Sequence, residues 1–448
     1  MKILVGCIAL LALAVCACAE TGVSLTVYNQ NLALVRDTRK MEFKKGQGEV
    51  QFRDVSAQID ATSVHFKTTG VEMLEQNFDY DLVSPDKLLQ KYVDKPIEVV
   101  SKTGTVTRGT LLTEQSQPSN QIVLRQEDGT LKTVLLSDNI AEIHYPTLPE
   151  GLITKPTLSW LVNSDANGDK ETEVSYLTGG LEWHADYVML LNEANTEADL
   201  DAWVTLNNTS GASYKDAKLK LIAGQVHRVQ PPQVPFLKAA NFAAAPSERQ
   251  FAEQAFFEYH LYSLQRPTTI LNNQTKQVSL FPSASAGISK VYKYDWQTDK
   301  DRVGVSTEFA NTEANGLGMA LPAGRVRVYQ KTADGSEEFI GEDSIEHTPK
   351  SEKVTVQIGT AFDIAAEHNQ LNFRRISDRV GETDYEVKLR NHKKEAVDVI
   401  VVDHFGGSWE ITHSSQDYKK VSAEKVEFRV TAEPEHEVSI TYTVRTTS

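Results

Sequence analysis

Cysteine is absent from almost the whole chain. The three cysteines, Cys7, Cys16 and Cys18, all lie within the first 18 of 448 residues. Disulfides, thiol nucleophiles, thiolate metal sites and iron–sulfur clusters all need cysteine, so they are excluded from the remainder. Removal of the first 19 residues leaves 429, which is long enough to bury several apolar cores without a covalent cross-link.

Catalytic motifs and long apolar runs are also missing. The sequence has no Gly-x-Ser-x-Gly elbow, Walker loop, dinucleotide fingerprint after a strand, or His-Glu-x-x-His helix. Beyond the N-terminus no apolar run is long enough to span a bilayer. The sequence therefore identifies no enzyme class, although a site assembled across several strands leaves no local motif.

Positive charge is in short supply. Lys2 is the only charged residue among the first 19, so the remainder has 45 basic and 61 acidic residues, a net charge of −16. Such a chain repels nucleic acid and anionic lipid headgroups. The charges are scattered rather than grouped, which favours solubility over an acidic binding face. We therefore expect no nucleic acid among the partners.

The first 19 residues have the pattern of a secretory signal. Lys2 precedes an apolar stretch, and Ala17-Cys18-Ala19 forms a small-x-small cleavage site before Glu20. The stretch is too short for a transmembrane helix. An alternative is lipidation of Cys18, which follows the small Ala17. We expect an exported protein, periplasmic or extracellular, with lipidation of Cys18 as its one route to a membrane and an outer-membrane lipoprotein as the alternative location.

The rest of the chain has the period-two alternation of antiparallel strands. Apolar residues alternate with polar ones in several runs, among them Val23-x-Leu25-x-Val27, Tyr385-x-Val387-x-Leu389, Val426-x-Phe428-x-Val430 and Val438-x-Ile440-x-Tyr442-x-Val444. Turn pairs separate the runs at Lys45-Gly46, Asp128-Gly129, Asn167-Gly168 and Asp334-Gly335. This pattern predicts an all-β protein made of antiparallel β-sandwich modules.

Helix signals are few. Ser84-Pro85-Asp86 places a capping residue and a first-turn proline before an apolar stretch. Ser247 to Gln250 has the form of a capping box before Phe251. The sequence predicts one short helix at each place.

The spacing of strands and turns also predicts the domain organisation. Five short strands between residues 95 and 145 indicate a small SH3-like or Sm-like barrel. We expect a signal peptide (1–19), an N-terminal β region of the main sandwich (20–90), an inserted small β-barrel (91–147), a central β domain (148–340, with a linker insertion at 230–257) and a C-terminal immunoglobulin-like sandwich (341–448).

Several segments together resemble a known family. They are 27–29 with 34–36, the run from Val174 to Tyr187, and then 258–262, 266–269, 275–277 and 321–329. With these the chain resembles an uncharacterised family of bacterial exported proteins, whose domain of unknown function is similar to the C-terminal part of mucoidy-inhibitor-A-like proteins. Unlike those proteins, this chain has no long coiled-coil region. The resemblance implies a bacterial envelope location and no catalytic residues.

Trp183-His184-Ala185-Asp186-Tyr187 is the richest polar and aromatic cluster. On a strand, His184 and Asp186 share one face, and the other three residues share the opposite face. Two such side chains hold a metal when a third ligand arrives from elsewhere. The alternative is a sheet with its aromatic face in the core, while His184 and Asp186 pair or face water.

A calcium-type loop runs from Asn163 to Glu173. Oxygen-bearing side chains alternate at Asp165, Asn167 and Asp169, and Gly168 is sixth. The pattern departs from a calcium loop because Val174 stands where a bidentate glutamate belongs. Independently of calcium, Asn167-Gly168 predicts a hairpin between strands at 158–161 and 173–177.

A third candidate surrounds Trp409. Asp403, His404, Glu410 and His413 combine there if the strand on either side of Gly406-Gly407 brings them together, but the spacing fits no standard ligand pattern. A loop at the end of a sandwich strand explains the same residues. No metal, cofactor or catalytic residue is therefore assigned, with calcium as the one cofactor to consider.

Composition, pattern and resemblance together predict a non-enzymatic binding or scaffolding protein of a bacterial envelope. Its partner is expected to be an envelope protein or a glycan. Two alternatives remain: an extracytoplasmic hydrolase or carbohydrate-active enzyme that pairs Asp186 or Glu182 with another carboxylate, and a calcium-stabilised adhesion module.

Overall fold

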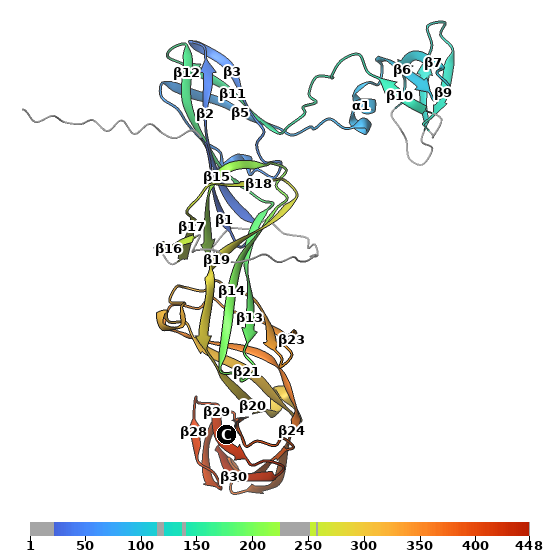
Figure 1. Cartoon of the computed structure of the whole chain (residues 1–448). Helices are drawn as coiled ribbons and strands as arrows, with labels where there is room; N and C mark the ends of the chain where they lie inside the picture. Colours follow the sequence, from blue (N-terminus) through green and yellow to red (C-terminus); the bar gives the residue numbers. More distant parts are fainter. Residues whose placement is uncertain (1–21, 114–120, 137–139, 225–250, 257–258, 448) are drawn as a thin grey trace, which may run out of the picture.

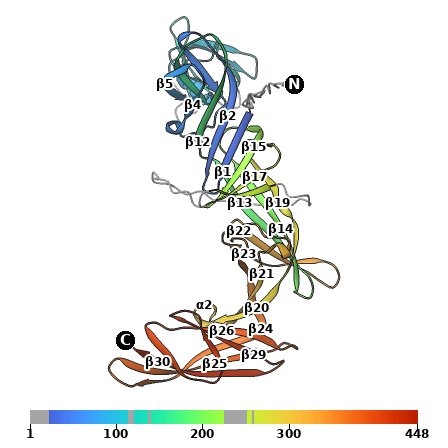
Figure 2. The ribbon, with the colours of Figure 1, turned by 90° about the vertical axis from the view of Figure 1, so that its left-hand side faces the viewer.

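The protein is an elongated all-β molecule, as the alternation predicts. The computed structural model describes residues 22–113, 121–136, 140–224, 251–256 and 259–447. Its sheets follow one another along one axis (Figures 1 and 2), and a smaller sheet projects to the side in Figure 1. The predicted export segment with Cys16 and Cys18 lies outside the described residues. Within those residues no helix is both long and apolar enough to cross a membrane.

The N-terminal sheet is built from strands that lie far apart in the sequence. Its strand order is β16-β17-β15-β1-β2-β12-β4, and β18 also pairs with β15. The β1–β15 pair is parallel, while the other pairs are antiparallel. The strands are β1 (Gly22–Tyr28), β2 (Leu32–Phe43), β4 (His65–Lys67), β12 (Gly168–Thr178), β15 (Tyr214–Ala223), β16 (Phe251–Phe256), β17 (Tyr259–Leu264) and β18 (Thr268–Ile270).

A two-stranded sheet packs against this one. It consists of β5 (Val71–Asp79) and β11 (Thr157–Ser164), and β3 (Gly46–Arg53) lies against β11. Trp160 of β11 fills the space between the layers, with its ring 5.8 Å from Phe52 and 5.0 Å from Phe66. A 3₁₀ turn, η1 (Ala61–Ser63), precedes β4.

The predicted hairpin at Asn167-Gly168 is wrong. β11 pairs with β5, whereas β12 pairs with β2 and β4, so the turn passes from one sheet to the next. All 11 residues of β12 are in register with β2, from Gly168 opposite Phe43 to Thr178 opposite Ala33. Alternation in the sequence marks where a strand lies. The strand that it pairs with is decided by a long-range partner that matches it along its whole length, which is β2 here.

The inserted unit contains five strands within or next to the predicted ranges. They are β6 (Pro96–Ser101), β7 (Val106–Leu111), β8 (Gln121–Arg125), β9 (Leu131–Leu135) and β10 (Ile140–His144), in the order β10-β6-β7-β8-β9. The predicted closed barrel is not found among the described residues, because β9 and β10 do not pair there. Only Val134 of β9 packs against the core, while Leu131 and Leu135 are 66% and 59% exposed, so little apolar surface draws this strand towards β10.

The central sheet contains the Trp183–Tyr187 segment. Its order is β19-β14-β13-β22-β23, and β13 and β22 are parallel. The strands are β13 (Leu181–Leu191), β14 (Glu197–Asn208), β19 (Gln274–Gly287), β22 (Gly324–Lys331) and β23 (Glu337–Ile345). Gly180 allows the sharp entry into β13: its φ is +75°, and a Cβ there would lie 2.6 Å from the Cα of Ser210.

The C-terminal sheet folds over on itself. Its order is β27-β30-β25-β24-β21-β20-β26-β29-β28, and Phe428 of β29 stacks on Tyr442 of β30 at 4.7 Å, which brings the two ends of this path together over one core. The strands are β20 (Ser289–Asp295), β21 (Arg302–Ala310), β24 (Lys353–Arg375), β25 (Val380–Asn391), β26 (Val397–His404), β27 (Ser408–Ser414), β28 (Tyr418–Lys420), β29 (Lys425–Ala432) and β30 (Glu437–Thr447). β20 and β21 precede residue 341 but belong to this sheet.

The short helices test the two sequence signals. α1 (Pro85–Lys91) begins where predicted, and the Ser84 side chain accepts a hydrogen bond from the backbone of Lys87. The capping box at Ser247 to Gln250 lies outside the described residues, and the helix predicted to follow it is wrong from Phe251 on, because Phe251–Phe256 is strand β16, paired with β17. Pairing of alternating residues overrides a local capping signal. The structure also has α2 (Trp296–Asp299) and a 3₁₀ turn, η2 (Glu313–Asn315).

Three apolar cores hold the described residues together. One runs through the N-terminal and central sheets, a second fills the C-terminal sheet, and a third belongs to the inserted unit alone. The separate third core means that the inserted unit is packed as a module of its own. We call residues 84–147 the side module.

Candidate functional sites

The open face of the central sheet carries the cluster predicted around His184. Trp183 and Tyr187 of β13 are 2% and 0% exposed and point into the core. His184 and Asp186 lie on the opposite face, as the alternation predicts. The core face is anchored further because the Tyr187 hydroxyl donates to the Pro322 carbonyl at 2.7 Å.

Asp186 is the centre of this cluster. Its Oδ2 lies 3.1 Å from His184 Nε2 and accepts a hydrogen bond from the Thr205 hydroxyl at 2.6 Å. Its Oδ1 lies 3.5 Å from a guanidinium nitrogen of Arg325 and 4.0 Å from one of Arg327. The parallel pairing of β13 with β22 places Arg325 directly opposite Asp186. The sequence predicted the His184–Asp186 pair but not the two arginines.

The charge state of Asp186 limits what the cluster can do. Burial raises the pKa of its carboxyl, but hydrogen bonds from His184 and Thr205 and the charge of Arg325 outweigh burial and lower the pKa to about 2. Asp186 is therefore ionised at neutral pH and accepts protons only under strong acid. It suits orientation of His184 and the arginines better than proton donation.

A second cluster surrounds Asp403 in the C-terminal core. Asp403 Oδ2 accepts from the Tyr442 hydroxyl at 2.6 Å and lies 3.1 Å from His368 Nε2, and its Oδ1 accepts from Trp296 Nε1 at 2.8 Å. The Trp296 ring stacks on the His368 ring at 4.7 Å. The side chains of Asp403 and His368 are only 2% and 8% exposed. The network joins four different elements, β26, β30, β24 and α2, and it is buried except at Trp296, which is 38% exposed.

The electrostatics of this cluster follow from burial and hydrogen bonding. Burial raises the pKa of Asp403, but hydrogen bonds from His368, Tyr442 and Trp296 lower it overall. Burial and the nearby Asp403 carboxylate raise the pKa of Tyr442. Tyr442 therefore stays a neutral hydrogen-bond donor, and Asp403 stays a charged acceptor.

The predicted grouping around Trp409 does not form. His404 Nε2 lies 2.9 Å from Asp295, and Glu410 lies 2.9 Å from an Arg445 nitrogen. His413 lines a separate surface pocket at the end of β27. The true partners of Asp403 come from elements that are distant in the sequence. The one sequence signal for them is the alternation that includes Tyr442, which predicts that this side chain is buried.

The residues of the calcium-type loop have protein partners. Asp165 Oδ1 lies 2.5 Å from Lys170 Nζ, and Asn167 Oδ1 accepts from the backbone N–H of Lys45 at 2.7 Å. Asp169 lies at the start of β12, opposite Glu42 of β2. Across the described ranges no group of three or more His, Asp or Glu side chains is arranged to hold a metal ion. Calcium binding by this loop stays a prediction.

The side module has a pocket of about 500 Å³. β7 and β8 pair at Thr110 and Leu111, and β8 ends at Arg125, which leaves a gap beside Arg108 of β7. Charged and aromatic side chains from both sides of this gap line the pocket: Glu98, Arg108, Arg125, Glu127, His144 and Tyr145. Glu98 and Arg108 form an ion pair at 2.5 Å. The volume falls within the range of ordinary ligand pockets.

Comparison with known proteins identifies the family. A family described as Domain of unknown function (DUF4139) matches residues 172–447, which extend from β12 to the last strand. No curated protein matches the chain. The matched region includes both the Asp186 cluster and the Asp403 cluster, whereas the side module lies before it. Because the match covers more than half of the chain, the protein belongs to the DUF4139 family.

Proposed function

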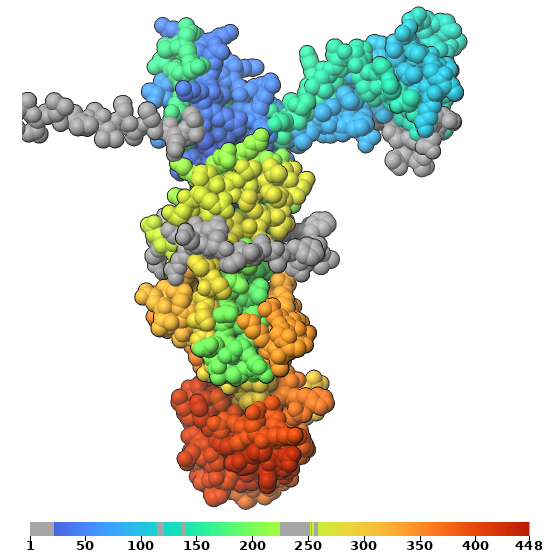
Figure 3. Space-filling model, in the orientation of Figure 1, coloured from blue at the N-terminus to red at the C-terminus, as the bar shows by residue number. Residues whose placement is uncertain are grey.

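We propose that this chain is an exported, non-enzymatic binding or scaffolding protein of a bacterial envelope, and that its side module is the part that binds. The observation that carries the proposal is the placement of this module. It projects from the long axis of the molecule and is joined to it by a narrow neck (Figures 1 and 3). A pocketed module held away from an elongated body is accessible to a large partner.

The neck consists of two chain segments tied to each other. β5 and β11 pair up to Asp79 and Thr157, and a bridge follows between Leu82 and Ile153. The Val83 N–H donates to the Ile153 carbonyl at 2.9 Å, and the Ile153 N–H donates to the Asp81 carbonyl at 3.0 Å. The chain therefore leaves and re-enters the body at one point, which is the geometry of a domain insertion.

The pocket chemistry favours a polar partner. Its lining pairs opposite charges, Glu98 with Arg108, and adds Arg125 and Glu127 from β8 and its turn. Tyr145 supplies an aromatic surface, and its ring meets Tyr92 edge-on at 4.9 Å. Such a surface suits a protein segment or a glycan, both of which offer many hydrogen-bonding groups.

Export and envelope location rest on the N-terminal sequence and the family resemblance. The small-x-small site before Glu20 supports cleavage, and Cys18 supports the lipid-anchored alternative. Similarity to mucoidy-inhibitor-A-like proteins is part of the same proposal. Mass analysis of the mature N-terminus tests the export part of the proposal, because cleavage before Glu20 and lipidation of Cys18 give different masses.

Neither Asp186 nor Glu182 supplies the proton donor that the alternative, a carbohydrate-active enzyme, needs. A glycosidase needs one carboxylic acid whose pKa is raised so that it donates a proton near neutral pH. The Asp186 pKa is instead lowered to about 2. Glu182, the other predicted carboxylate, accepts a hydrogen bond from Asn207 at 3.3 Å and lies on the exposed face of β13. Neither residue has the environment of a catalytic acid.

Photo-crosslinking in intact cells tests the binding role. A benzoylphenylalanine probe replaces Gln126 in the pocket, and a matched probe replaces the exposed Glu337 of β23. We expect a discrete adduct from position 126 that Arg108→Glu removes, and no equivalent adduct from position 337. Equal adducts from both positions, or none from position 126, would contradict the proposal.

A deletion variant supplies the folding control. Residues 84–151 are replaced by a short Gly-Ser linker between Val83 and Leu152, which lie at the neck. Because the module has its own core, we expect the thermal midpoint and circular dichroism of the body to be retained. The partner identified by the crosslink from position 126 is then followed by co-purification with the deletion variant, and loss of co-purification with a folded body assigns binding to the module.

A further inference from the structure

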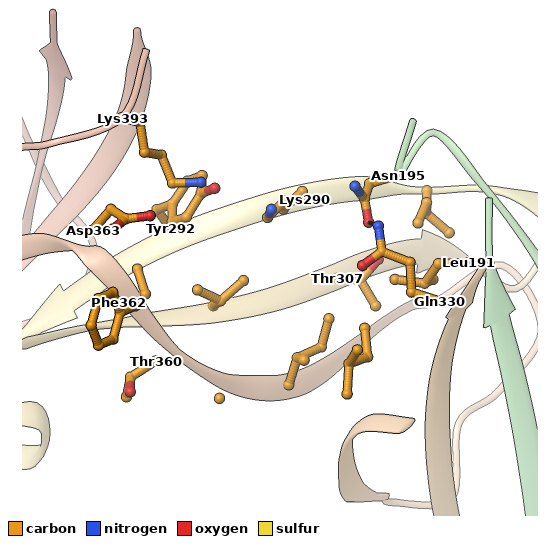
Figure 4. Close-up of a pocket in the computed structure, with 16 residues that line it drawn as sticks. Leu191, Asn195, Lys290, Tyr292, Thr307, Gln330, Thr360, Phe362, Asp363 and Lys393 are labelled. Carbon is orange, nitrogen blue, oxygen red and sulfur yellow. Dashed lines mark hydrogen bonds between the residues drawn. The ribbon is translucent and has the colours of Figure 1, made fainter. Parts of the chain in front are cut away.

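A cavity of about 270 Å³ lies where the central sheet meets the C-terminal sheet. Figure 4 shows its lining side chains: Leu191, Asn195 and Gln330 come from the central sheet and its loops, while Lys290, Tyr292 and Thr307 come from β20 and β21. Residues 358–363 of β24 complete the wall. This cavity is separate from the side module and from both aspartate clusters.

Thr307 gives the first sign of a ligand. It is 1% exposed, and its hydroxyl oxygen has no hydrogen-bond partner among the described residues. It lines the cavity from the same face of β21 as Val305. A buried hydroxyl without a partner is disfavoured, and in the wall of this cavity the Thr307 hydroxyl is a polar atom that no described residue satisfies.

The floor of the cavity is apolar. Five aliphatic side chains line it and offer no hydrogen bond of their own: Leu191, Ile288, Val305, Ile340 and Ile358. Burial of an apolar body against such a floor is favourable by the hydrophobic effect. At about 30 Å³ for each water-sized unit, the volume suits a ligand of roughly ten non-hydrogen atoms.

One end of the cavity is cationic. The ammonium groups of Lys290 and Lys393 lie 5.3 Å and 5.6 Å from the Tyr292 ring centre. Lys290 makes no ion pair with the described residues, whereas Lys393 lies 3.7 Å from Glu395. Asp363 is the only acidic residue in the lining, so the lining has a net positive charge in a protein of net charge −15. Phe362, which is fully exposed, stands at the same end (Figure 4).

We propose that this cavity binds a small amphipathic anion, with a carboxylate or phosphate beside Lys290 and Lys393 and an apolar body along the aliphatic floor. The Lys290 ammonium supplies the unpaired positive charge, and Tyr292 holds both lysines in place by its ring. Because both sheets line the cavity, the bound ligand also holds the central and C-terminal units together.

Calorimetric titration of the full chain tests the charge and the apolar body separately. Octanoate and octyl phosphate represent the two anionic head groups, octylamine carries the opposite charge on the same chain, and acetate lacks the apolar body. We expect saturable binding of one anion per chain, and the tighter of the two identifies the head group. Octylamine and acetate are expected to bind at least about tenfold more weakly, which is 1.4 kcal/mol.

Variants locate the site. Lys290→Met is expected to weaken anion binding about tenfold or more, the effect of one charge-assisted contact. Thr307→Val preserves shape and is expected to weaken binding while the ligand-free midpoint stays the same or rises. Lys102→Met, a lysine in the side module, is the matched control and leaves binding unchanged. Unchanged binding in both Lys290→Met and Thr307→Val would overturn the proposal, as would equal affinity for octylamine.

The deletion variant separates this proposal from the proposed function. Removal of residues 84–151 takes away the side-module pocket but leaves the junction cavity, so octanoate binding persists. If the chain shows no saturable binding of either anion at concentrations below micelle formation, the cavity proposal fails while the role of the side module stands.

Discussion

The Asp186 and Asp403 clusters use the same chemistry in opposite settings. Each places a strand aspartate beside a histidine Nε2 at 3.1 Å and a hydroxyl donor at 2.6 Å. The side chain of His184, beside Asp186, is 45% exposed, whereas that of His368, beside Asp403, is 8% exposed. An aspartate, a histidine and a hydroxyl donor therefore belong to a partly solvated surface cluster in one sheet and to a largely buried network in the other.

The difference teaches which cluster contributes most to stability. Removal of the Asp403 carboxylate leaves Tyr442 and His368 without their partner in a place that water does not reach. A carboxylate at an open sheet face leaves partners that water can reach, and its ion pairs are screened. We therefore expect Asp403 to matter for folding and Asp186 to matter less.

Asp403→Ala should give the largest effect. The change leaves the buried Tyr442 and His368 without their partner and also takes an acceptor from Trp296 and from the His404 backbone N–H. We therefore expect a loss of about 3 to 5 kcal/mol in the unfolding free energy of the C-terminal unit. Hydrogen exchange of peptides from β26 and β30 measures this locally, and peptides of the side module serve as the internal control. A loss below about 1 kcal/mol would show that the network is not sealed.

Asp186→Ala should give a smaller effect on the other side of the comparison. Thr205 loses a partner, but His184 and Arg325 remain half-exposed and are rehydrated, so we expect a loss of about 1 to 2 kcal/mol. Exchange of peptides from β13 and β22 measures it. Asp186→Asn, which keeps the shape of the side chain, is the matched variant. If Asp186→Ala cost as much as Asp403→Ala, the contrast between open and closed clusters would be wrong.

The pH dependence of the unfolding free energy tests the role of the Asp186 charge directly. The folded pKa of Asp186 is about 2, below the ordinary value of about 3.9 for an unfolded aspartate, so its charge stabilises the fold above pH 4. This stabilisation is lost as pH falls from about 4 to about 2. We therefore expect the stability difference between the wild type and Asp186→Asn to be full at pH 6 and to shrink towards zero at pH 2. A difference that stays constant with pH would show that the charge of Asp186 plays no part.

The two clusters also show how far the sequence alone reaches. His184 and Asp186 are two residues apart on one strand, so alternation places them on the same face without knowledge of the fold. The partners of Asp403 come from residues 296, 368 and 442, which only the tertiary arrangement brings together. Pairing between strands is a long-range property, and no local signal in the sequence specifies it.

The long-range nature of strand pairing also explains which fold predictions were right and which were wrong. Alternation and turn pairs correctly gave the all-β class and the five strands of the side module, and the Ser84 cap with Pro85 correctly gave the helix that follows. They failed at Asn167-Gly168 and at Phe251, where a local turn or cap signal competes with a strand partner elsewhere in the chain. The prediction that the side module closes into a barrel failed for a related reason. Closure depends on how much apolar surface β9 turns towards the core, which the alternation alone does not specify.

Removal of divalent cations should give the smallest effect. Lys170 already occupies the Asp165 carboxylate, and the Lys45 N–H occupies Asn167. An incoming calcium ion must displace both partners, so any gain from its binding is reduced by their loss. We expect a chelator to shift the thermal midpoint by less than about 1 °C. Lys170→Ala frees the carboxylate and is the informative partner variant, because a calcium-dependent rise of several degrees in that variant alone would show that Lys170 replaces the ion in the wild type.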